Sequence, residues 1–304
     1  MENHKMKKRI LSVGEIIWDV YSDRRVIGGA PLNFAAHAAR LGAESSLLSA
    51  VGEDALGDAA LSALRAFGVG TAWVRRNARP TGQCTVTLDA QGVPHYDVLR
   101  DMAYDHIRLS PQELADIRAA NFDVLYFGTL IQRAPESRAT LRRIVENCRP
   151  ETVFCDVNLR RDCYDAESAR FCLEQATVLK VSMEEEPTLR ALGLYTVTED
   201  TPRGIARALC ERFGQLRTVL LTLGKDGSYG YRTESGEDCF RPAVGERVVS
   251  TVGAGDSFSA AFLTDYLCGK PLAVCMEKAA RISGFVVAHT EAVPEYPPSL
   301  LAPQ

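Results

Sequence analysis

A glycine-rich loop near the carboxyl end of the chain carries the clearest chemical signal. Residues 250–258 read Ser-Thr-Val-Gly-Ala-Gly-Asp-Ser-Phe, and the apolar residues that follow have the spacing of a helix. The first backbone N–H groups of a helix have no partner within it and carry partial positive charge. Without side chains at Gly253 and Gly255, a phosphate can approach that backbone closely. The loop therefore predicts an anion site at a helix start, with Asp256 beside it.

Asp256 has a structural and a catalytic interpretation. An acidic residue in the first turn of a helix is common, because it faces the positive end of the helix dipole. In the catalytic interpretation, the same carboxylate accepts the proton of a hydroxyl that attacks phosphorus. Phosphoryl transfer needs a base beside groups that stabilise anionic charge, and the loop supplies both. The residues alone leave a first-turn acid and a general base as alternatives.

A second glycine-rich loop lies near the amino end, where residues 28–33 read Gly-Gly-Ala-Pro-Leu-Asn. Pro31 suits the first position of a helix, and small residues follow it at helical spacing. The glycine pair lets the backbone approach a ligand, while the Asn33 amide can exchange hydrogen bonds with hydroxyl groups. A glycine turn packed against a neighbouring helix is the alternative.

Strands and helices must position these loops, and the apolar pattern predicts both. Short apolar runs alternate with stretches of helical spacing such as 56–67, which is typical of βαβ units. The candidate strands are residues 9–17, 46–51, 123–127, 152–158, 177–182 and 218–223. We therefore predict an α/β fold with a mainly parallel central sheet flanked by helices. Such sheets bind ligands at the carboxyl ends of their strands.

One segment departs from this alternation. Residues 83–88 and 93–98 flank the turn 89–92, which predicts an antiparallel β-hairpin. A hairpin inside an α/β chain usually belongs to a small separate sheet, with a lid over the active site and a dimer interface as the two candidate roles. No repeat or linker interrupts the chain, so we expect residues 1–304 to form one main domain with a lid.

Composition and charge restrict the partners. Hydrophobic residues make up 46% of the 304 residues and charged residues 24%, which is ordinary for a globular protein. The net charge of −4 argues against a broad nucleic-acid surface. The sequence also lacks the uninterrupted apolar run of a signal peptide or membrane span. We expect a cytoplasmic protein that binds neither nucleic acid nor membrane.

Several other functional patterns are missing from the sequence. The nine cysteines are scattered without a Cys-x-x-Cys pair, which favours buried reduced thiols. The five histidines have no metal-ligand spacing, and His106 after Asp105 reads most simply as part of a surface loop. The Walker glycine–lysine loop is absent, which excludes a P-loop kinase, and the glycine spacing disfavours a dinucleotide-binding dehydrogenase.

Together, the two loops resemble the ribokinase-like (PfkB) carbohydrate kinases. That family carries a Gly-Gly-x-x-x-Asn motif early and an Asp-Thr-x-Gly-Ala-Gly-Asp motif late. Further segments look like family blocks in their expected order, at 51–57, 156–160, 180–185 and 222–228. The resemblance covers nearly the whole chain and is closest to bacterial fructokinases. It implies a ribokinase-like fold and the transfer of a phosphoryl group from ATP to a sugar hydroxyl.

The resemblance also implies a role for each matching position. Asp256 would be the catalytic base, and the anion hole would be formed by Gly253, Ala254 and Gly255. The nucleotide would lie against Lys180, Ser182, Thr222, Gly224 and Gly227. The sugar would be held by Asp19, Gly28, Gly29, Asn33 and Arg160. Glu185 would help to place Mg²⁺ through water, and the lid would combine residues 16–27 and 81–100.

Two positions depart from the family pattern. Ser250 stands where the signature usually has Asp, which puts in doubt the K⁺ site that many members form and leaves K⁺ open as a cofactor beside ATP and Mg²⁺. Ser182 stands where many members have Asn, a change that is familiar in fructokinase-like members. Neither departure removes the base or the anion hole.

The acceptor sugar is expected to be fructose, because the segments around Glu15, Arg160 and Lys180 resemble those of bacterial fructokinases. Related 2-keto-3-deoxygluconate kinases share much of this pattern, and Arg160 would suit a carboxylate there. A structural ion pair is the alternative for Arg160. Ribose kinases, nucleoside kinases and a non-catalytic sugar- or nucleotide-binding regulator stay as alternatives. A homodimer through the lid is a further expectation, because a hairpin has exposed edges.

Overall fold

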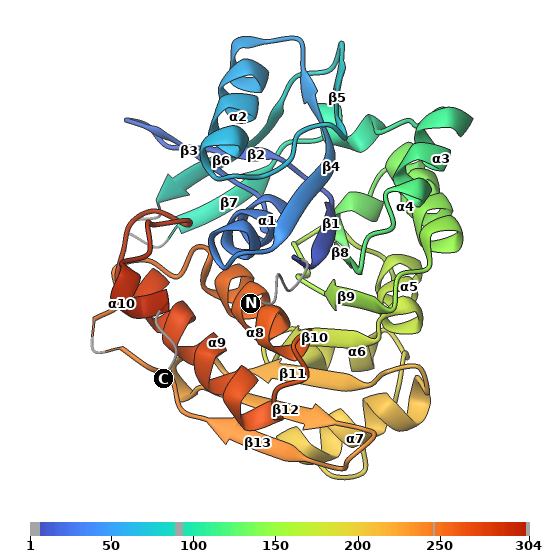
Figure 1. Cartoon of the computed structure of the whole chain (residues 1–304), viewed down its shortest axis with the longest axis vertical. Coiled ribbons are helices and arrows are strands. Elements are labelled where there is room, and N and C mark those ends of the chain that lie inside the picture. The colour runs from blue at the N-terminus through green and yellow to red at the C-terminus, as the bar shows by residue number, and fades with distance from the viewer. Residues whose placement is uncertain (1–6, 89–93, 246, 302–304) are drawn as a thin grey trace, which may run out of the picture.

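The computed structural model describes residues 7–88, 94–245 and 247–301, and two sheets organise them (Figure 1). The main sheet has nine strands in the order β13-β12-β11-β10-β9-β8-β1-β4-β5. Their bounds are β1 (Arg9–Val13), β4 (Glu44–Gly52), β5 (Val74–Asn77), β8 (Val124–Phe127), β9 (Thr152–Asp156), β10 (Val178–Ser182), β11 (Thr218–Thr222), β12 (Ser228–Arg232) and β13 (Asp238–Arg241). The strands from β11 to β5 pair in parallel, whereas β12 and β13 are antiparallel. The predicted mainly parallel sheet is confirmed, with two unpredicted antiparallel strands at one edge.

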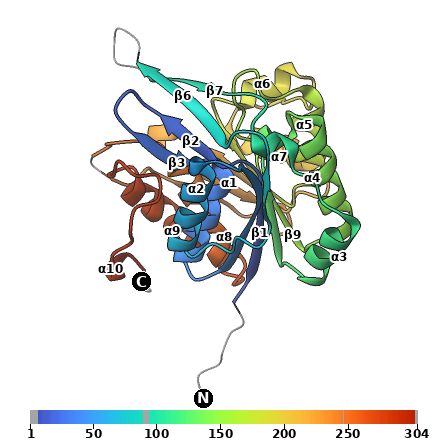
Figure 2. The same cartoon turned by 90° about the horizontal axis from the view of Figure 1, so that it is seen from above.

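Helices cover both faces of this sheet, as Figure 2 shows from above. One layer contains α1 (Ala30–Arg40), α2 (Ala55–Ala66), α8 (Ala254–Tyr266) and α9 (Leu272–Val286). The other contains α3 (Pro111–Ala119), α4 (Pro135–Cys148), α5 (Ala166–Gln175), α6 (Glu186–Ala191) and α7 (Pro202–Arg212). Short helical turns are η1 (Ala103–His106), η2 (Leu130–Gln132), η3 (Gly224–Asp226) and the terminal α10 (Pro298–Leu301). In the described ranges, no helix has both the length and the apolar character that a membrane crossing requires.

The core lies in two layers, one on each face of the main sheet. Alternate side chains of β8 enter opposite layers, because neighbouring residues of a strand point to opposite faces. Leu125 and Phe127 pack with the layer of α3 to α7, while Val124 and Tyr126 pack with α1, α8 and α9. The continuous apolar run at 124–127 therefore reflects a strand that is buried on both faces.

The predicted strand 9–17 is wrong in extent, because the chain changes sheets in its middle. β1 ends at Val13, and the next strand begins at Ile17 in the second sheet. At the break, a β-carbon on Gly14 would lie 2.3 Å from Cγ of Pro31, so the chain passes too close to α1 for a side chain. The five other predicted main-sheet strands are present, with bounds shifted by one or two residues.

The second sheet projects beyond one end of the main sheet (Figure 2). It contains β2 (Ile17–Val20), β3 (Arg25–Gly28), β6 (Gly82–Leu88) and β7 (Pro94–Val98), in the order β3-β2-β6-β7. β6 and β7 are antiparallel, as the hairpin prediction requires, and β2 runs parallel to β6. The predicted turn at 89–92 lies outside the described residues. Two segments far apart in the sequence thus form one small sheet, which we call the lid sheet.

Candidate active site

The late glycine loop leads into α8 through a left-handed residue. Gly253 has φ 79° and precedes the helix, and a β-carbon there would lie 2.4 Å from the carbonyl oxygen of Ala292. Both features require glycine. The Ala254 N–H donates to the carbonyl oxygen of Thr251 at 3.2 Å, so this predicted anion-hole amide already has a partner within the loop. Asp256 lies in the first turn, where a carboxylate faces the amino end of α8.

The early glycine loop leads into α1 in a similar way. Gly29 has φ 109°, and a β-carbon there would lie 2.6 Å from the carbonyl oxygen of Glu15. Gly29 has no side chain to cap the helix, and Oε1 of Glu15 instead accepts from the Ala30 N–H at 3.2 Å. α1 packs against α8, so Nδ2 of Asn33 donates to Oδ2 of Asp256 at 2.9 Å. The two predicted loops therefore meet.

A pocket of about 280 Å³ lies where both loops meet the carboxyl ends of β9 and β10. Nine of the predicted site residues line it: Asp19, Gly28, Gly29, Asn33, Arg160, Lys180, Gly253, Gly255 and Asp256. The lid sheet adds apolar and weakly polar side chains from Ile17, Cys84, Tyr96 and Val98. The predicted sugar-binding and catalytic residues thus share one cavity, roofed by the lid sheet.

A buried ion pair forms part of this pocket. Lys180 and Asp156 are paired residues on neighbouring strands, and Nζ donates to both carboxylate oxygens at 2.9 and 2.8 Å. Burial is the largest single effect and would lower the pKa of Lys180, but the charges of Asp156 and Glu185 and the hydrogen bonds to Asp156 together outweigh it and raise that pKa. A β-carbon at Gly255 would lie 3.1 Å from Nζ, so glycine makes room for the ammonium group. Lys180, predicted in the nucleotide site, therefore lies beside the start of α8.

The carboxylates of the pocket are harder to ionise than free ones. Burial, followed by repulsion from Asp156, raises the pKa of Asp256 to about 6, against the opposing Asn33 hydrogen bond and Lys180 charge. Burial also raises the pKa of Asp19 to about 6, with Arg160 opposing it. Raised pKa values of this kind are concentrated at functional sites.

Glu15 is a site residue that sequence reasoning missed, as is Asp156. The side chain of Glu15 is only 4% exposed and lines the pocket, and burial raises its pKa to about 7. Its pattern signal is weak, since an acid directly after a strand can equally face water. The packing of α1 and of the segments after β8 and β9 around Glu15 encloses it.

The remaining predicted nucleotide residues lie further along the same strands. Ser182 ends β10 and pairs with Thr222 at the end of β11. Gly224 begins the turn η3, and Gly227 follows it with φ 122°, where a β-carbon would lie 2.1 Å from the carbonyl oxygen of Arg241. The backbone geometry therefore requires glycine at 227 whether or not this residue contacts a nucleotide. Lys180 lies two residues before Ser182, so this set continues from the pocket along β10.

Glu185 joins the ends of two strands. Its Oε2 accepts from the Ser182 N–H at 2.9 Å, and its Oε1 accepts from the Leu159 N–H at 2.6 Å. Each oxygen keeps a lone pair for a further donor. In the described ranges, no three His, Cys, Asp or Glu side chains gather as direct metal ligands. Glu185 therefore fits a Mg²⁺ ion held mainly by phosphate oxygens and water.

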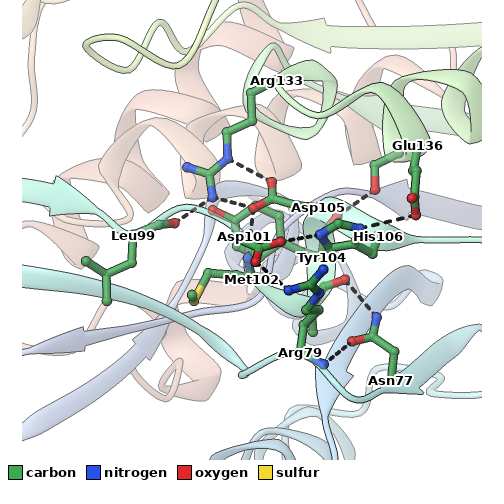
Figure 3. Close-up of polar contacts among 12 residues, drawn as sticks. Asn77, Arg79, Leu99, Asp101, Met102, Tyr104, Asp105, His106, Arg133 and Glu136 are labelled. Atoms are coloured by element: carbon green, nitrogen blue, oxygen red, sulfur yellow. Dashed lines mark hydrogen bonds and ion pairs between the residues drawn. The ribbon is translucent and has the colours of Figure 1, made fainter.

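Asp105 and His106 do not form the predicted surface loop. Asp105 is buried in η1, and Figure 3 shows its carboxylate facing the guanidinium of Arg133. His106 lies between Asp101 and Glu136, with Nε2 2.7 Å from Oδ1 of Asp101 (Figure 3). We call Asp101, Asp105, His106, Arg133 and Glu136 the lid-base cluster. Arg133 also donates to the carbonyl oxygen of Leu99, just after β7, and this contact links the cluster to the lid sheet. The cluster connects the lid sheet to α4.

Comparison with known proteins places the chain among sugar kinases. The model of the pfkB family of carbohydrate kinases matches residues 6–298. The chain is 27% identical to an ATP-dependent 6-phosphofructokinase of Thermoanaerobacterium thermosaccharolyticum, over 96% of this chain and 91% of that protein. It is 31% identical to a fructokinase of Klebsiella pneumoniae, over 85% and 84%. The solved structure of a Xylella fastidiosa fructokinase has the same fold, with a TM-score of 0.82, 20% identity and 97% of both chains covered.

Proposed function

Since this chain belongs to the pfkB family of carbohydrate kinases, we propose that it transfers the γ-phosphoryl group of ATP to a hydroxyl of fructose, with Asp256 as base. The observation that carries the proposal is the position of Asp256 in the first turn of α8. Its carboxylate faces the pocket, beside the amides of the glycine loop and the ammonium group of Lys180. A base and an anion site therefore adjoin one another, as in-line transfer requires.

In this mechanism, the sugar binds in the pocket under the lid sheet. Asp19 and Asn33 hold its hydroxyl groups, and the lid excludes water that would otherwise accept the phosphoryl group. Asp256 takes the proton of the attacking hydroxyl while the oxygen–phosphorus bond forms. The Gly253–Gly255 backbone then faces the charge that develops on the transferred group.

The nucleotide and its metal occupy the adjoining strand ends. ATP lies against Ser182, Thr222, Gly224 and Gly227, at the ends of β10 and β11 and the turn that follows. When bound, Mg²⁺ would neutralise phosphate charge, and Glu185 would help to hold it through water. The hydroxyl of Ser250 accepts from the Val252 N–H at 3.2 Å, so this residue closes its own loop where a K⁺ ligand would be expected.

A sugar with an anionic substituent is the second candidate acceptor, and Arg160 favours it. Its guanidinium lines the pocket and makes no hydrogen bond or ion pair within the described part of the chain. Guanidinium groups recognise carboxylate and phosphate groups by paired hydrogen bonds. The 6-phosphofructokinase among the relatives is named for a substrate of this kind.

The test is an ADP-release assay with Mg-ATP and a panel of fructose, fructose 6-phosphate, 2-keto-3-deoxygluconate, ribose and adenosine. We expect turnover with fructose that is lost in Asp256→Asn. Turnover with only the anionic sugars, reduced by Arg160→Gln, would replace fructose by the second candidate. No turnover with any acceptor, in a sample that binds ATP, would refute both.

Oligomeric state is a separate proposal. β3 and β7 are the edges of the lid sheet, and we propose that a second copy pairs with one of them. Light scattering across a concentration series tests this, and a monomer at all concentrations would refute it.

A further inference from the structure

Asn33 contacts the proposed base directly, although the two residues are 223 positions apart. Its side chain is 3% exposed, and Nδ2 lies 2.9 Å from Oδ2 of Asp256. An ionised carboxylate has only acceptor atoms, so the amide must present its N–H to Asp256 and its carbonyl oxygen elsewhere. One oxygen of the base is therefore occupied before any substrate arrives.

The other end of the Asn33 amide has no partner among the described residues, although Asn33 lines the pocket. Its Oδ1 is buried and has no hydrogen-bond partner within the described ranges. A β-carbon on Gly28 would lie 3.9 Å from both amide heteroatoms, and the bare glycine leaves that space to a ligand. An amide that served only packing would have both ends paired, because an unpaired buried acceptor costs free energy.

Contacts at the start of α1 hold the Asn33 amide in place. Asn33 lies in the first turn of α1, whose first N–H is bound by Glu15 and whose Pro31 carbonyl accepts from Ser12 Oγ at 2.8 Å. α1 packs along α8, which carries Asp256. The two helices therefore determine the distance between the amide and the carboxylate.

We infer that Asn33 is a positioning residue for the base. By occupying Oδ2, it leaves Oδ1 of Asp256 as the oxygen that receives the proton, and it keeps the carboxylate ionised at neutral pH. The hydroxyl proton passes to Oδ1 as its oxygen bonds to the γ-phosphorus, and the bond from that phosphorus to the bridging oxygen of ADP breaks. This inference rests on the proposed function.

The charges around Asp256 indicate what loss of the amide would do. The groups that face it are Glu15, Tyr126, Asp156, Arg160 and Lys180. Burial and Asp156 raise its pKa to about 6, while the Asn33 hydrogen bond, Lys180 and Arg160 lower it. Without the amide N–H, the pKa of Asp256 would rise further. Because the base must be ionised, the acid limb of the kcat–pH profile would move to higher pH.

The test compares kcat against pH at saturating sugar for wild type, Asn33→Asp and Asn33→Ala. Asn33→Asp has the same shape but sets a second carboxylate against the base, so the acid limb should move up by at least about one pH unit. Because the pKa of Asp256 is about 6 in the wild type, a rise of about one unit leaves about half of the base ionised at pH 7. The kcat of Asn33→Asp at pH 7 should therefore fall about twofold or more and recover in alkali. Asn33→Ala frees the carboxylate to rotate, and we expect a loss of up to about 10²-fold.

Asp19→Asn is the matched control, since Asp19 lines the same pocket without contacting Asp256. It should raise KM for the sugar while the acid limb of kcat stays in place. Melting temperature and ATP affinity show whether each variant is folded. If Asn33→Asp and Asn33→Ala are both folded and their acid limbs lie at the wild-type pH, the inference is overturned and the proposed function stays intact. Full activity of Asp256→Asn would instead refute the proposed function.

Discussion

The pocket and the lid-base cluster both contain buried charges, but they differ in how fully those charges are paired. In the lid-base cluster, Nε and Nη2 of Arg133 each donate to one oxygen of Asp105 at 2.8 Å, and both side chains are 4% exposed. The Met102 N–H adds a donor to Asp105 at 3.0 Å, and Leu99 accepts from Arg133. Charge and hydrogen-bonding geometry match here (Figure 3).

The pocket is not balanced in this way. Lys180 is already paired with Asp156, although its charge also lowers the pKa of Asp256. The exposed guanidinium of Arg160 lowers the pKa of Asp256, Asp19 and Glu15 without pairing with any of them. The buried Oδ1 of Asn33 has no partner in the described chain. Paired networks rigidify a fold, whereas raised pKa values and unpaired groups are typical of sites that await a ligand. The comparison separates charges that stabilise this protein from charges that act on substrate.

The largest expected effect is a loss of kcat after a substitution in the pocket. Asp256→Asn keeps the shape of the side chain and removes the proton acceptor, so kcat should fall by about 10²- to 10⁴-fold with near-normal ATP affinity. The matched control is Asp265→Asn on the same helix, where Asp265 is paired with Lys270 and Lys278. It should lower stability and leave kcat within about twofold, since it lies outside the pocket. Equal kcat losses in both variants would contradict the comparison.

In the lid-base cluster, removal of one partner of the Arg133–Asp105 ion pair should lower the free energy of unfolding. Arg133→Met leaves the Asp105 carboxylate buried without its cation, and we expect a loss of about 3–5 kcal/mol in the free energy of unfolding. The double variant Arg133→Met with Asp105→Leu should regain most of this loss, because no buried charge is left. Urea unfolding measures both variants. A double variant no more stable than Arg133→Met would show that the pair does more than compensate charge.

The buried carboxylate of Glu15 should lower the free energy of unfolding at pH values where it is ionised. Its pKa is raised to about 7, chiefly by burial, so the folded state binds more protons than the unfolded state between about pH 4.5 and 7. Stability therefore falls as pH rises through this window. Glu15→Gln still accepts from Ala30 and should gain up to about 3 kcal/mol at pH 8, with little change at pH 4. Thermal unfolding at the two pH values checks this, and a variant less stable at pH 8 would contradict it.

The smallest effect is expected at the rim of the lid-base cluster. Arg79 pairs with Asp101 at 2.5 Å, but the side chains are 51% and 56% exposed. Exposed pairs contribute at most about 1 kcal/mol and weaken with salt. Arg79→Ala should therefore change the free energy of unfolding by less than this amount, and less again in 1 M NaCl. A loss comparable to that of Arg133→Met would contradict this and would show that the exposed pair stabilises the fold as much as the buried pair does.

The fold class and the two loops of the site could be predicted from local patterns of residues. The run at 124–127 is apolar throughout because each residue enters one of two buried layers, and this signal is local. Gly253 and Gly29 could be singled out because backbone without a side chain lets a ligand approach closely, and the structure adds that both glycines have positive φ. Three blocks that resemble the kinase family lie at the strand ends that border the pocket and in the adjoining turn, at 156–160, 180–185 and 222–228. The block at 51–57 instead joins β4 to α2 and does not line the pocket. Local patterns sufficed wherever the constraint was local.

Which groups meet and which are buried could not be predicted, because both depend on the packing of elements that are distant in the chain. Asp105 and Glu15 look like ordinary surface acids in the sequence, and the packing of α4 and α1 encloses them. Lys180 faces Asp156 because of the register between β9 and β10, which no local spacing encodes. The contact of Asn33 with Asp256 depends on how α1 packs against α8. Burial and long-range contact are properties of assembled layers, so they arise only when elements distant in the chain come together.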